Sequence, residues 1–553
     1  MSRFIILDPG LRGFIGHYFE NAVHVLEAAS RAGLSPLLVA HRSCPADIGQ
    51  PFGVPILPTY THDCGGARQG PRGWTVGSLN ERIEAFAAET GGLLDAIAAG
   101  PGDTILLSSC QIEDVVGLVQ LVKGHPNARE VSWHLLFRAS IPRTRTDGCE
   151  AIVASWRVAF RQLLGCLPPE QVHLYADTDF LAADLSFLLE GLPFGTIPYP
   201  VNPTLRPAHL PRPAGRPLRV VYFGDARREK GFGALPYVTH RLWSRYVETG
   251  QVEFVIQCNL PNPPCAESDT AMARWHLAQM AGPGLRLLPE ALTSDAYRDL
   301  ILSADVALLP YDSNRYFVRS SGVLIEALSA GVPAIVPSGT WMSDQLAGPS
   351  AAYLADLPKR APVVATGDIE RLTAAPTGAH TAIRLPQPGG ADAAIVTLRL
   401  QSAGDLPVPA YVLAQQIQSG LGDTICGRSR AVLGRFAGGG DARSWLFRIA
   451  PQAQHIALGL ANAYEAQPLP GLALHVDYLD TRHAYPGGCP LGSVGLTAAA
   501  VEDVPELIME MVQHHDHYRD GAWAHAGQWA RDHSPERLVA MIAAGSRQEV
   551  AVG

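Results

Sequence analysis

Short apolar runs alternate with stretches of helical periodicity from the first residues of the chain onward. Runs such as FIIL at 4–7 and DTILLS at 103–108 predict buried strands, and the segments between such runs carry apolar residues at the spacing of one helix face. A proline-rich segment without apolar periodicity, 202–217, interrupts the alternation, which starts again with LRVVYF at 218–223. Strands that alternate with helices indicate an α/β fold with parallel sheets. We therefore expect two Rossmann-like domains that face a cleft, the first spanning 1–201, with 202–217 as the linker.

The pattern changes after Leu346, and the segment 348–369 is transitional, without a clear periodicity. The segment 365–485 holds many short strand-like runs, such as IVTLRLQ at 395–401, separated by glycine-rich turns. This spacing predicts a β-sandwich-like module. Because the β/α pattern resumes afterwards, the second Rossmann-like domain is expected to comprise 218–354 and 490–545, with the β-rich module inserted into it.

Composition and charge narrow the function classes. The formal net charge of -9 gives no general affinity for nucleic acid, and nine scattered cysteines without a CxxC pair do not favour zinc ribbons or thioredoxin chemistry. The first residues run into an apolar strand without the layout of a signal peptide, and no apolar stretch approaches the roughly 20 residues of a spanning helix. We expect a cytoplasmic protein, with peripheral association at the inner face of the membrane as an alternative.

The segment 311–346 carries the strongest chemical pattern. It follows the strand DVALLP and opens a helix with Ser320, Ser321 and Gly322, at the place where parallel sheets bind ligands. Free N–H groups and the helix dipole favour a phosphate there, and Glu326, one turn further on, is placed to accept hydrogen bonds from a ribose diol. An ordinary βαβ unit with a solvated glutamate is the alternative explanation.

Cationic residues follow the first strand of the second domain. The loop GDARREKG at 224–231 contains Arg227 and Lys230, whose charges suit the negative charge that develops on a leaving diphosphate. A solvated charged turn is the plainer alternative. A glycine-rich loop, 8–16, also follows the first strand of the chain, but it does not match GxGxxG and indicates a dinucleotide site only weakly.

The string EALSAGVP at 326–333 resembles a motif of the GT-B glycosyltransferases, in particular the retaining GT4-like group. The resemblance covers roughly 1–347 and 490–545 and leaves out the insert. It implies that Glu326 holds the ribose hydroxyls of a nucleotide sugar and that the loop at 224–231 holds the diphosphate.

Two positions depart from the family's pattern. Val318 stands where a glutamate usually contacts the donor sugar, and Asp225 stands where an arginine is usual. Carried over residue by residue, the resemblance implies three sets of site residues. They are Arg227, Lys230 and His134 as catalytic residues; Gly16, Glu326, Ser320, Ser321, Gly322, Arg319 and Glu290 as donor-binding residues; and His17 and Arg138 as acceptor-binding residues. A satisfied core histidine is the alternative explanation of His134.

The resemblance thus implies a retaining hexosyltransferase that depends on a nucleoside-diphosphate sugar and needs no cofactor or metal. The expected acceptor is a glycan, a lipid or a small molecule, and no nucleic-acid partner is expected. The alternatives are an inverting transferase or epimerase of GT-B fold, and a catalytically degenerate protein that binds glycan or regulates. The insert, with aromatic residues in its strands, is expected either to bind glycan or to mediate assembly of a homo-oligomer.

Overall fold

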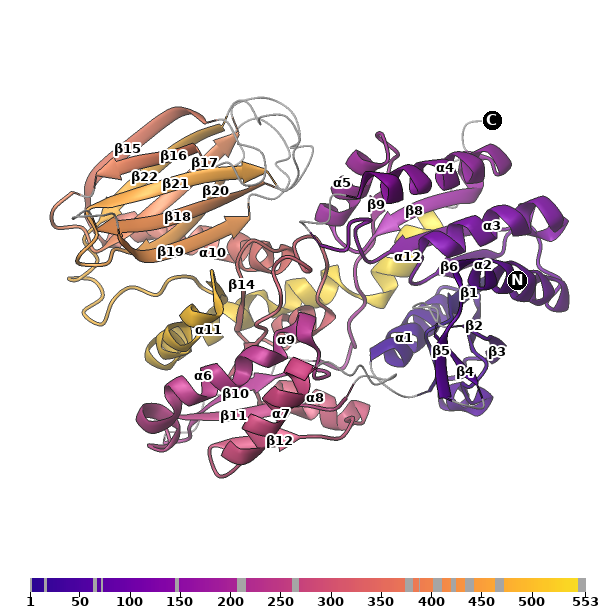
Figure 1. The fold of residues 1–553 in the computed structure, drawn as a ribbon, viewed down its shortest axis with the longest axis horizontal. Coiled ribbons are helices and arrows are strands. Elements are labelled where there is room, and N and C mark those ends of the chain that lie inside the picture. Colours follow the sequence, from indigo (N-terminus) through magenta and orange to yellow (C-terminus); the bar gives the residue numbers. More distant parts are fainter. Residues whose placement is uncertain are drawn as a thin grey trace.

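The computed structural model describes residues 2–13, 17–62, 67–70, 73–144, 149–205, 215–260, 268–372, 381–386, 388–400, 410–418, 424–432, 442–462 and 472–545. Within this part, two parallel sheets form two Rossmann-like domains, and two antiparallel sheets form a third unit beside them (Figure 1). The proposed linker 202–217 lies partly outside the described residues, which stop at 205 and start again at 215.

The N-terminal domain is built on a parallel sheet of seven described strands in the order β3-β2-β1-β6-β7-β8-β9. Helices cover both faces, so alternate residues of one strand enter different cores: Phe4 and Ile6 pack with α1, whereas Ile5 and Leu7 pack on the opposite face. The strands and helices of this domain are β1 (Arg3–Asp8), α1 (His17–Arg31), β2 (Ser35–His41), β3 (Ile56–Tyr60), the hairpin β4 (Ala67–Gly70) and β5 (Gly73–Val76), α2 (Leu79–Ala96), β6 (Thr104–Leu107), α3 (Ile112–Gly124), β7 (Ser132–Phe137), α4 (Glu150–Cys166), β8 (Val172–Ala176), α5 (Asp179–Leu188) and β9 (Gly195–Thr196).

The second domain repeats this architecture with six described strands in the order β12-β11-β10-β13-β14-β23, again all parallel. Its elements are β10 (Leu218–Tyr222), α6 (Leu235–Leu242), β11 (Val252–Gln257), α7 (Ser268–Met280), β12 (Leu285–Leu288), α8 (Ser294–Ser303), β13 (Val306–Leu308), α9 (Gly322–Ser329), β14 (Ala334–Pro337), α10 (Trp341–Arg360), β23 (Gly495–Ala498), α11 (Val504–Asp532) and α12 (Pro535–Gly545). Strand β23 comes after the insert in sequence and pairs with β14, so the insert interrupts one continuous sheet.

The C-terminal helices return the chain to the first domain. Helix α11 bends at His514, whose backbone is not helical, and α12 then packs on α1 (Figure 1). Leu538, Val539 and Ile542 of α12 belong to the same buried cluster as Phe19 of α1. The α/β class and the two Rossmann-like domains of a GT-B fold, both predicted from the sequence, are confirmed by this topology.

The insert consists of two antiparallel sheets, with the described strands ordered β15-β22-β17-β20 and β16-β21-β18-β19. One face of the first sheet packs on α10 through Ile395, Leu446 and Leu479, and residues on its other face, such as Val396 and Val476, are buried as well. The strands are β15 (Val363–Leu372), β16 (Thr381–Pro386), β17 (Ala393–Leu400), β18 (Ala410–Gln418), β19 (Thr424–Val432), β20 (Ala442–Arg448), β21 (His455–Asn462) and β22 (Leu472–Leu479).

Polar contacts join the insert to the second domain, and they also join β15, the first strand of the insert, to β22 beside it. Arg448 of β20 pairs with the buried carboxylate of Glu510 on α11 at 2.7 Å. On the surface of the first sheet, His475 lies between two carboxylates, with Nδ1 at 2.6 Å from Asp368 and Nε2 at 2.9 Å from Asp477. Asp368 on β15 and His475 on β22 lie directly opposite each other in the two paired strands, so their contact joins these strands.

One segment differs from the sequence expectation. The stretch from 348 to 360, which lacks a clear periodicity, continues α10 although Pro349 and Pro358 lie inside it. The helix persists because Leu354 and Leu357 bury one of its faces against the insert. Among the described residues, none of the helices combines the length and the apolar character that crossing a membrane requires.

Candidate functional site

The loop after β10 folds back on itself, so that the ammonium group of Lys230 lies close to Gly224 at the start of the loop. Gly224 has φ +96°, and a Cβ there would lie 2.5 Å from the Lys230 Nζ, so only glycine allows this approach. The Gly224 N–H donates to Gln257 Oε1 at 2.7 Å, and the Ala226 N–H donates to the Asn259 carbonyl at 2.9 Å. The end of β11 therefore holds the loop in place.

Lys230 is a buried cation, 4% exposed. Burial lowers the pKa of Lys230 to about 8; the charge of Arg227 adds to this effect, and Asp225, Glu229 and Glu326 oppose it. Arg227 is itself half-buried and contacts Glu229 at 3.1 Å. With a pKa of about 8, the ammonium is still mostly protonated at neutral pH, and a bound anion would stabilise that charge.

Helix α9 places Glu326 beside this loop. Ser321 caps the helix, accepting a hydrogen bond from the Leu324 N–H at 3.2 Å. Glu326, one turn in, is 3% exposed and accepts a hydrogen bond from the Tyr297 hydroxyl at 2.8 Å. Burial raises the pKa of Glu326 to about 7; the Tyr297 bond and Lys230 oppose the rise, and Glu20 of α1 adds to it.

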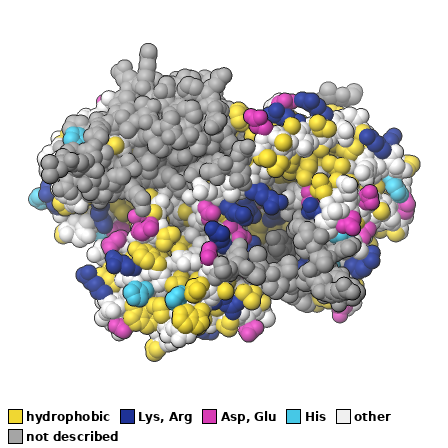
Figure 2. Space-filling model, viewed as in Figure 1, with side chains coloured by type: hydrophobic (Ala, Val, Ile, Leu, Met, Phe, Trp, Pro, Cys, Tyr) yellow, Lys and Arg dark blue, Asp and Glu magenta, His cyan; other side chains and the backbone are white. Residues whose placement is uncertain are grey.

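The described residues thus bring Arg227, Lys230 and Glu326 together at the carboxyl ends of β10 and β13. This edge is where open parallel sheets bind ligands. Figure 2 shows Lys, Arg, Asp and Glu side chains gathered along the junction of the two Rossmann-like domains.

Residues of the N-terminal domain lie against the start of α9. The Ser320 hydroxyl donates to Asp177 Oδ2 at 2.5 Å, and the Thr178 hydroxyl donates to the Val318 carbonyl at 2.6 Å. A Cβ on Gly322 would lie 2.5 Å from the ring of Tyr199, so this ring covers the first turn of α9.

Two arginines of the predicted site lie at the same junction. Arg138, after β7, donates to the Ser108 carbonyl at 2.8 Å and sits 5.2 Å from the centre of the Tyr199 ring. Arg319 sits 5.0 Å from the centre of the Tyr316 ring. Both arginines favour the ionised form of Asp177, so Arg138 and Arg319 approach one carboxylate from the two domains.

The other predicted residues lie apart from this cluster or outside the described part. His134 is fully buried in β7, with Nε2 at 3.1 Å from the Ser132 hydroxyl, and its ring stacks on His173. This is the environment of a core histidine. Glu290 is exposed in the loop after β12. Gly16 and the side chain of His17 lie outside what the structure describes.

Several residues of the site have no signal in the sequence. Tyr297 on α8 bonds Glu326, and Tyr199 covers Gly322, but neither belongs to a motif. Asp177 belongs to no motif either. A pairing of Asp177 with the 320 region, more than a hundred positions away, arises from how the domains meet.

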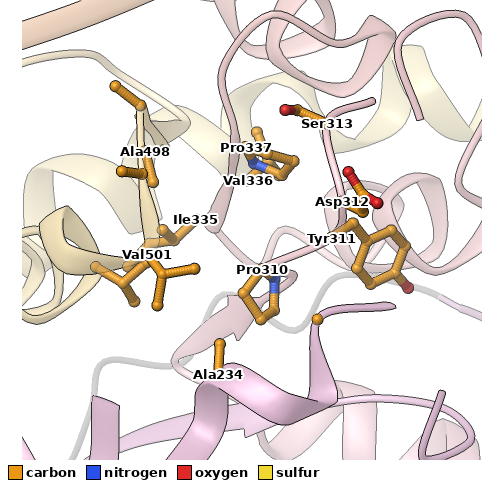
Figure 3. Close-up of a pocket in the computed structure, with 14 residues that line it drawn as sticks. Ala234, Pro310, Tyr311, Asp312, Ser313, Ile335, Val336, Pro337, Ala498 and Val501 are labelled. Carbon is orange, nitrogen blue, oxygen red and sulfur yellow. The ribbon is translucent and has the colours of Figure 1, made fainter. Parts of the chain in front are cut away.

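A cavity of about 300 Å³ lies beside the 310–313 loop (Figure 3). Tyr311 and Gly231 are among the residues that line it. The walls are mainly apolar and come from the carboxyl ends of β13, β14 and β23, with Pro310, Val336 and Ala498 among them. Asp312 lines this cavity, whereas Lys230 and Glu326 do not.

The chain has distant structural similarity to solved proteins but no match at the level of sequence families or curated sequences. Sucrose-phosphate synthase from Thermosynechococcus elongatus has 14% identity and a TM-score of 0.45, over 63% of this chain and 84% of that one. HepE from Anabaena, solved with UDP-glucose, has 12% identity and a TM-score of 0.42, over 63% and 83%.

A glycosyltransferase from Rickettsia africae has 11% identity and a TM-score of 0.41, over 60% of this chain and 78% of that one. Identity and TM-scores this low carry no inference about activity. The GT-B fold of this chain is established by its own strand order and by the return of α12 to the first domain.

Proposed function

We propose that the protein is a glycosyltransferase that takes a sugar from a nucleoside-diphosphate sugar. The observation that carries the proposal is the meeting of two cations, Arg227 and Lys230, with the buried carboxylate Glu326 at the carboxyl edge of the second sheet. A diphosphate needs positive charge, and a ribose diol needs an acceptor of two hydrogen bonds. The cluster offers both within one site.

Each residue then has a stated task. Lys230 and Arg227 stabilise the negative charge that builds on the diphosphate as the sugar leaves, so no metal ion or cofactor is expected to be required. Glu326 accepts hydrogen bonds from the ribose hydroxyls. The N–H groups at the start of α9, next to Ser321 and Gly322, bind a phosphate oxygen once Tyr199 moves away from Gly322.

Transfer would proceed with retained configuration by a front-face path. The bond from C1 of the sugar to the diphosphate oxygen breaks, the acceptor oxygen bonds to C1 on the same face, and the acceptor's proton passes to the leaving diphosphate. The donor is expected to carry a hexose, and the acceptor to be a glycan, a lipid-linked sugar or a small molecule. Closure of the domains would exclude water and protect the donor from hydrolysis.

A panel of nucleoside diphosphates tests the proposal by thermal shift, because a ligand that binds only the folded protein raises its melting temperature. We expect one of UDP, GDP, ADP or TDP to raise the melting temperature of the wild type. Lys230→Ala and Glu326→Ala should remove this rise. Arg228→Ala is the matched control, since Arg228 is in the same loop with a side chain 74% exposed.

Absence of any shift in the wild type, or an unchanged shift in both site variants, would contradict the proposed site. A second candidate, a nucleotide-binding protein without transferase activity, is favoured by one observation. Val318, at the family position of the sugar-binding glutamate, is fully buried and apolar, with its carbonyl bonded to Thr178. Nucleotide binding without turnover of any sugar nucleotide would select it.

A further inference from the structure

Asp177 is a buried carboxylate at the domain junction to which the proposed donor site assigns no task. It follows β8 and is 5% exposed. Its Oδ2 accepts the hydrogen bond from Ser320, while its Oδ1 is buried and has no hydrogen-bond partner among the described residues. A buried carboxylate oxygen without a partner is costly, so it needs a reason in a native structure.

Burial and the neighbouring charges act on the carboxyl of Asp177 in opposite directions. Burial raises the pKa of Asp177, and the charges of Arg138 and Arg319, together with the bond from Ser320, oppose the rise. Asp8, at the end of β1, is buried near the same Arg138, which acts on its carboxyl as well. The charge of Arg138 therefore acts on two carboxyl groups of the first sheet, Asp8 and Asp177.

The place of Asp177 relative to α9 decides what its free oxygen faces. Ser320 directly precedes the helix start where the proposed donor would place its diphosphate. If the diphosphate binds there, a group bonded to Asp177 is near it. A carboxylate accepts hydrogen bonds from O–H and N–H donors and repels phosphates and carboxylates, and the donors that a sugar acceptor carries are hydroxyl groups.

We infer that Asp177 binds the acceptor, accepting at Oδ1 a hydrogen bond from a hydroxyl of a neutral, polyhydroxylated molecule such as a glycoside. The inference rests on the proposed function. In the transfer, a neighbouring hydroxyl of the same molecule reacts: its oxygen forms the bond to C1, the diphosphate leaves with the electron pair of the broken bond, and the proton of that hydroxyl goes to the diphosphate. Asp177 holds the other hydroxyl, thereby orients the acceptor, and is unchanged at the end.

Two neighbouring substitutions separate acceptor binding from a contact that merely joins the domains. Asp177→Asn keeps the size of the side chain and removes its charge, and Thr178→Val removes the adjacent interdomain hydrogen bond to Val318. Full-length variants are saturated with the nucleoside diphosphate that shifts the wild type, and methyl glycosides of glucose, galactose and mannose are titrated by saturation-transfer NMR. The nucleotide Kd is measured separately by calorimetry.

We expect at least one methyl glycoside to bind the wild-type complex. Its Kd should rise about tenfold or more in Asp177→Asn, the effect of losing a hydrogen bond to a charged group, and should stay within about threefold in Thr178→Val. The nucleotide Kd should stay within about threefold in both variants.

Three results would overturn the inference: no glycoside binds the wild-type complex, Asp177→Asn binds the glycoside as the wild type does, or Thr178→Val loses as much affinity as Asp177→Asn. If no nucleoside diphosphate binds the wild type at all, the proposed function itself fails, and the two failures are thereby distinguished.

Discussion

Replacing Glu326 with glutamine is expected to make the protein more stable at alkaline pH while weakening nucleotide binding. Burial raises the pKa of this carboxyl to about 7, from an ordinary value of 4.5. A carboxyl whose pKa is higher in the folded than in the unfolded state destabilises the fold as pH rises through that interval, because the unfolded state loses its proton more readily. At about 1.4 kcal/mol per pKa unit, the full effect is about 3 kcal/mol near pH 8 and about 1 kcal/mol or less near pH 5.

Glutamine is neutral throughout this range and keeps an oxygen for the Tyr297 hydroxyl. Glu326→Gln should therefore melt at a higher temperature than the wild type at pH 8, with little difference at pH 5, in scanning calorimetry. The figure of about 3 kcal/mol already includes the charge of Lys230, which opposes the rise of this pKa. Glu84→Gln, on the exposed face of α2, serves as control and should change neither melting temperature.

The same variant should bind the nucleoside diphosphate at least about tenfold more weakly at pH 8, because ribose hydroxyls bond a carboxylate more strongly than an amide. An equal melting temperature of Glu326→Gln and wild type at pH 8, or the same gain at pH 5 as at pH 8, would refute the reasoning from burial. A gain in stability together with unchanged nucleotide affinity would remove Glu326 from the site and leave its burial effect intact.

Two further predictions concern the loop of Lys230 and the insert. Gly224→Ala should weaken nucleotide binding at least about tenfold in calorimetry, since its Cβ would displace the Lys230 ammonium, whereas Gly250→Ala, also at positive φ but facing open space, should bind as the wild type does. Equal affinities in the two variants would count against the close approach. Burial lowers the pKa of His475, but its two aspartate partners raise it, and the net result is a pKa above the ordinary value of 6.5. The contact therefore stabilises the fold fully below pH 6.5, and this stabilisation is lost as the pH rises through the pKa of His475 in the folded protein. His475→Ala should accordingly lower the melting temperature more at pH 6 than at pH 8.5, and an equal loss at both would show that charge has no part in it.

Local patterns in the sequence predict the sheets and the cationic loop well for a physical reason. A strand buried on both faces needs a continuous apolar run, and a helix beside it needs apolar residues at i, i+3 and i+4, so both leave local signals. The loop after β10 and the start of α9 inherit their place from those elements. Arg227, Lys230 and Glu326 meet because carboxyl ends of parallel strands share one edge.

Contacts that depend on how helices and domains pack have no local signal. Tyr297 reaches Glu326 from α8, and Asp177 and Tyr199 reach the start of α9 from the other domain. For His134 the sequence offers a candidate that the structure places in the core. A histidine in a strand has the same sequence pattern whether its side chain faces a ligand or the core. Pro349 within α10 likewise has a helix-breaking signal that burial against the insert overrides.

A crystal structure of the protein with the nucleoside diphosphate that shifts its melting temperature is the most direct measurement. We predict the diphosphate between Lys230, Arg227 and the first turn of α9, the ribose hydroxyls on Glu326, and Tyr199 displaced from Gly322. A nucleotide bound instead in the apolar cavity beside Ala498, or elsewhere with Lys230 and Glu326 untouched, would contradict a donor site at this edge of the second sheet.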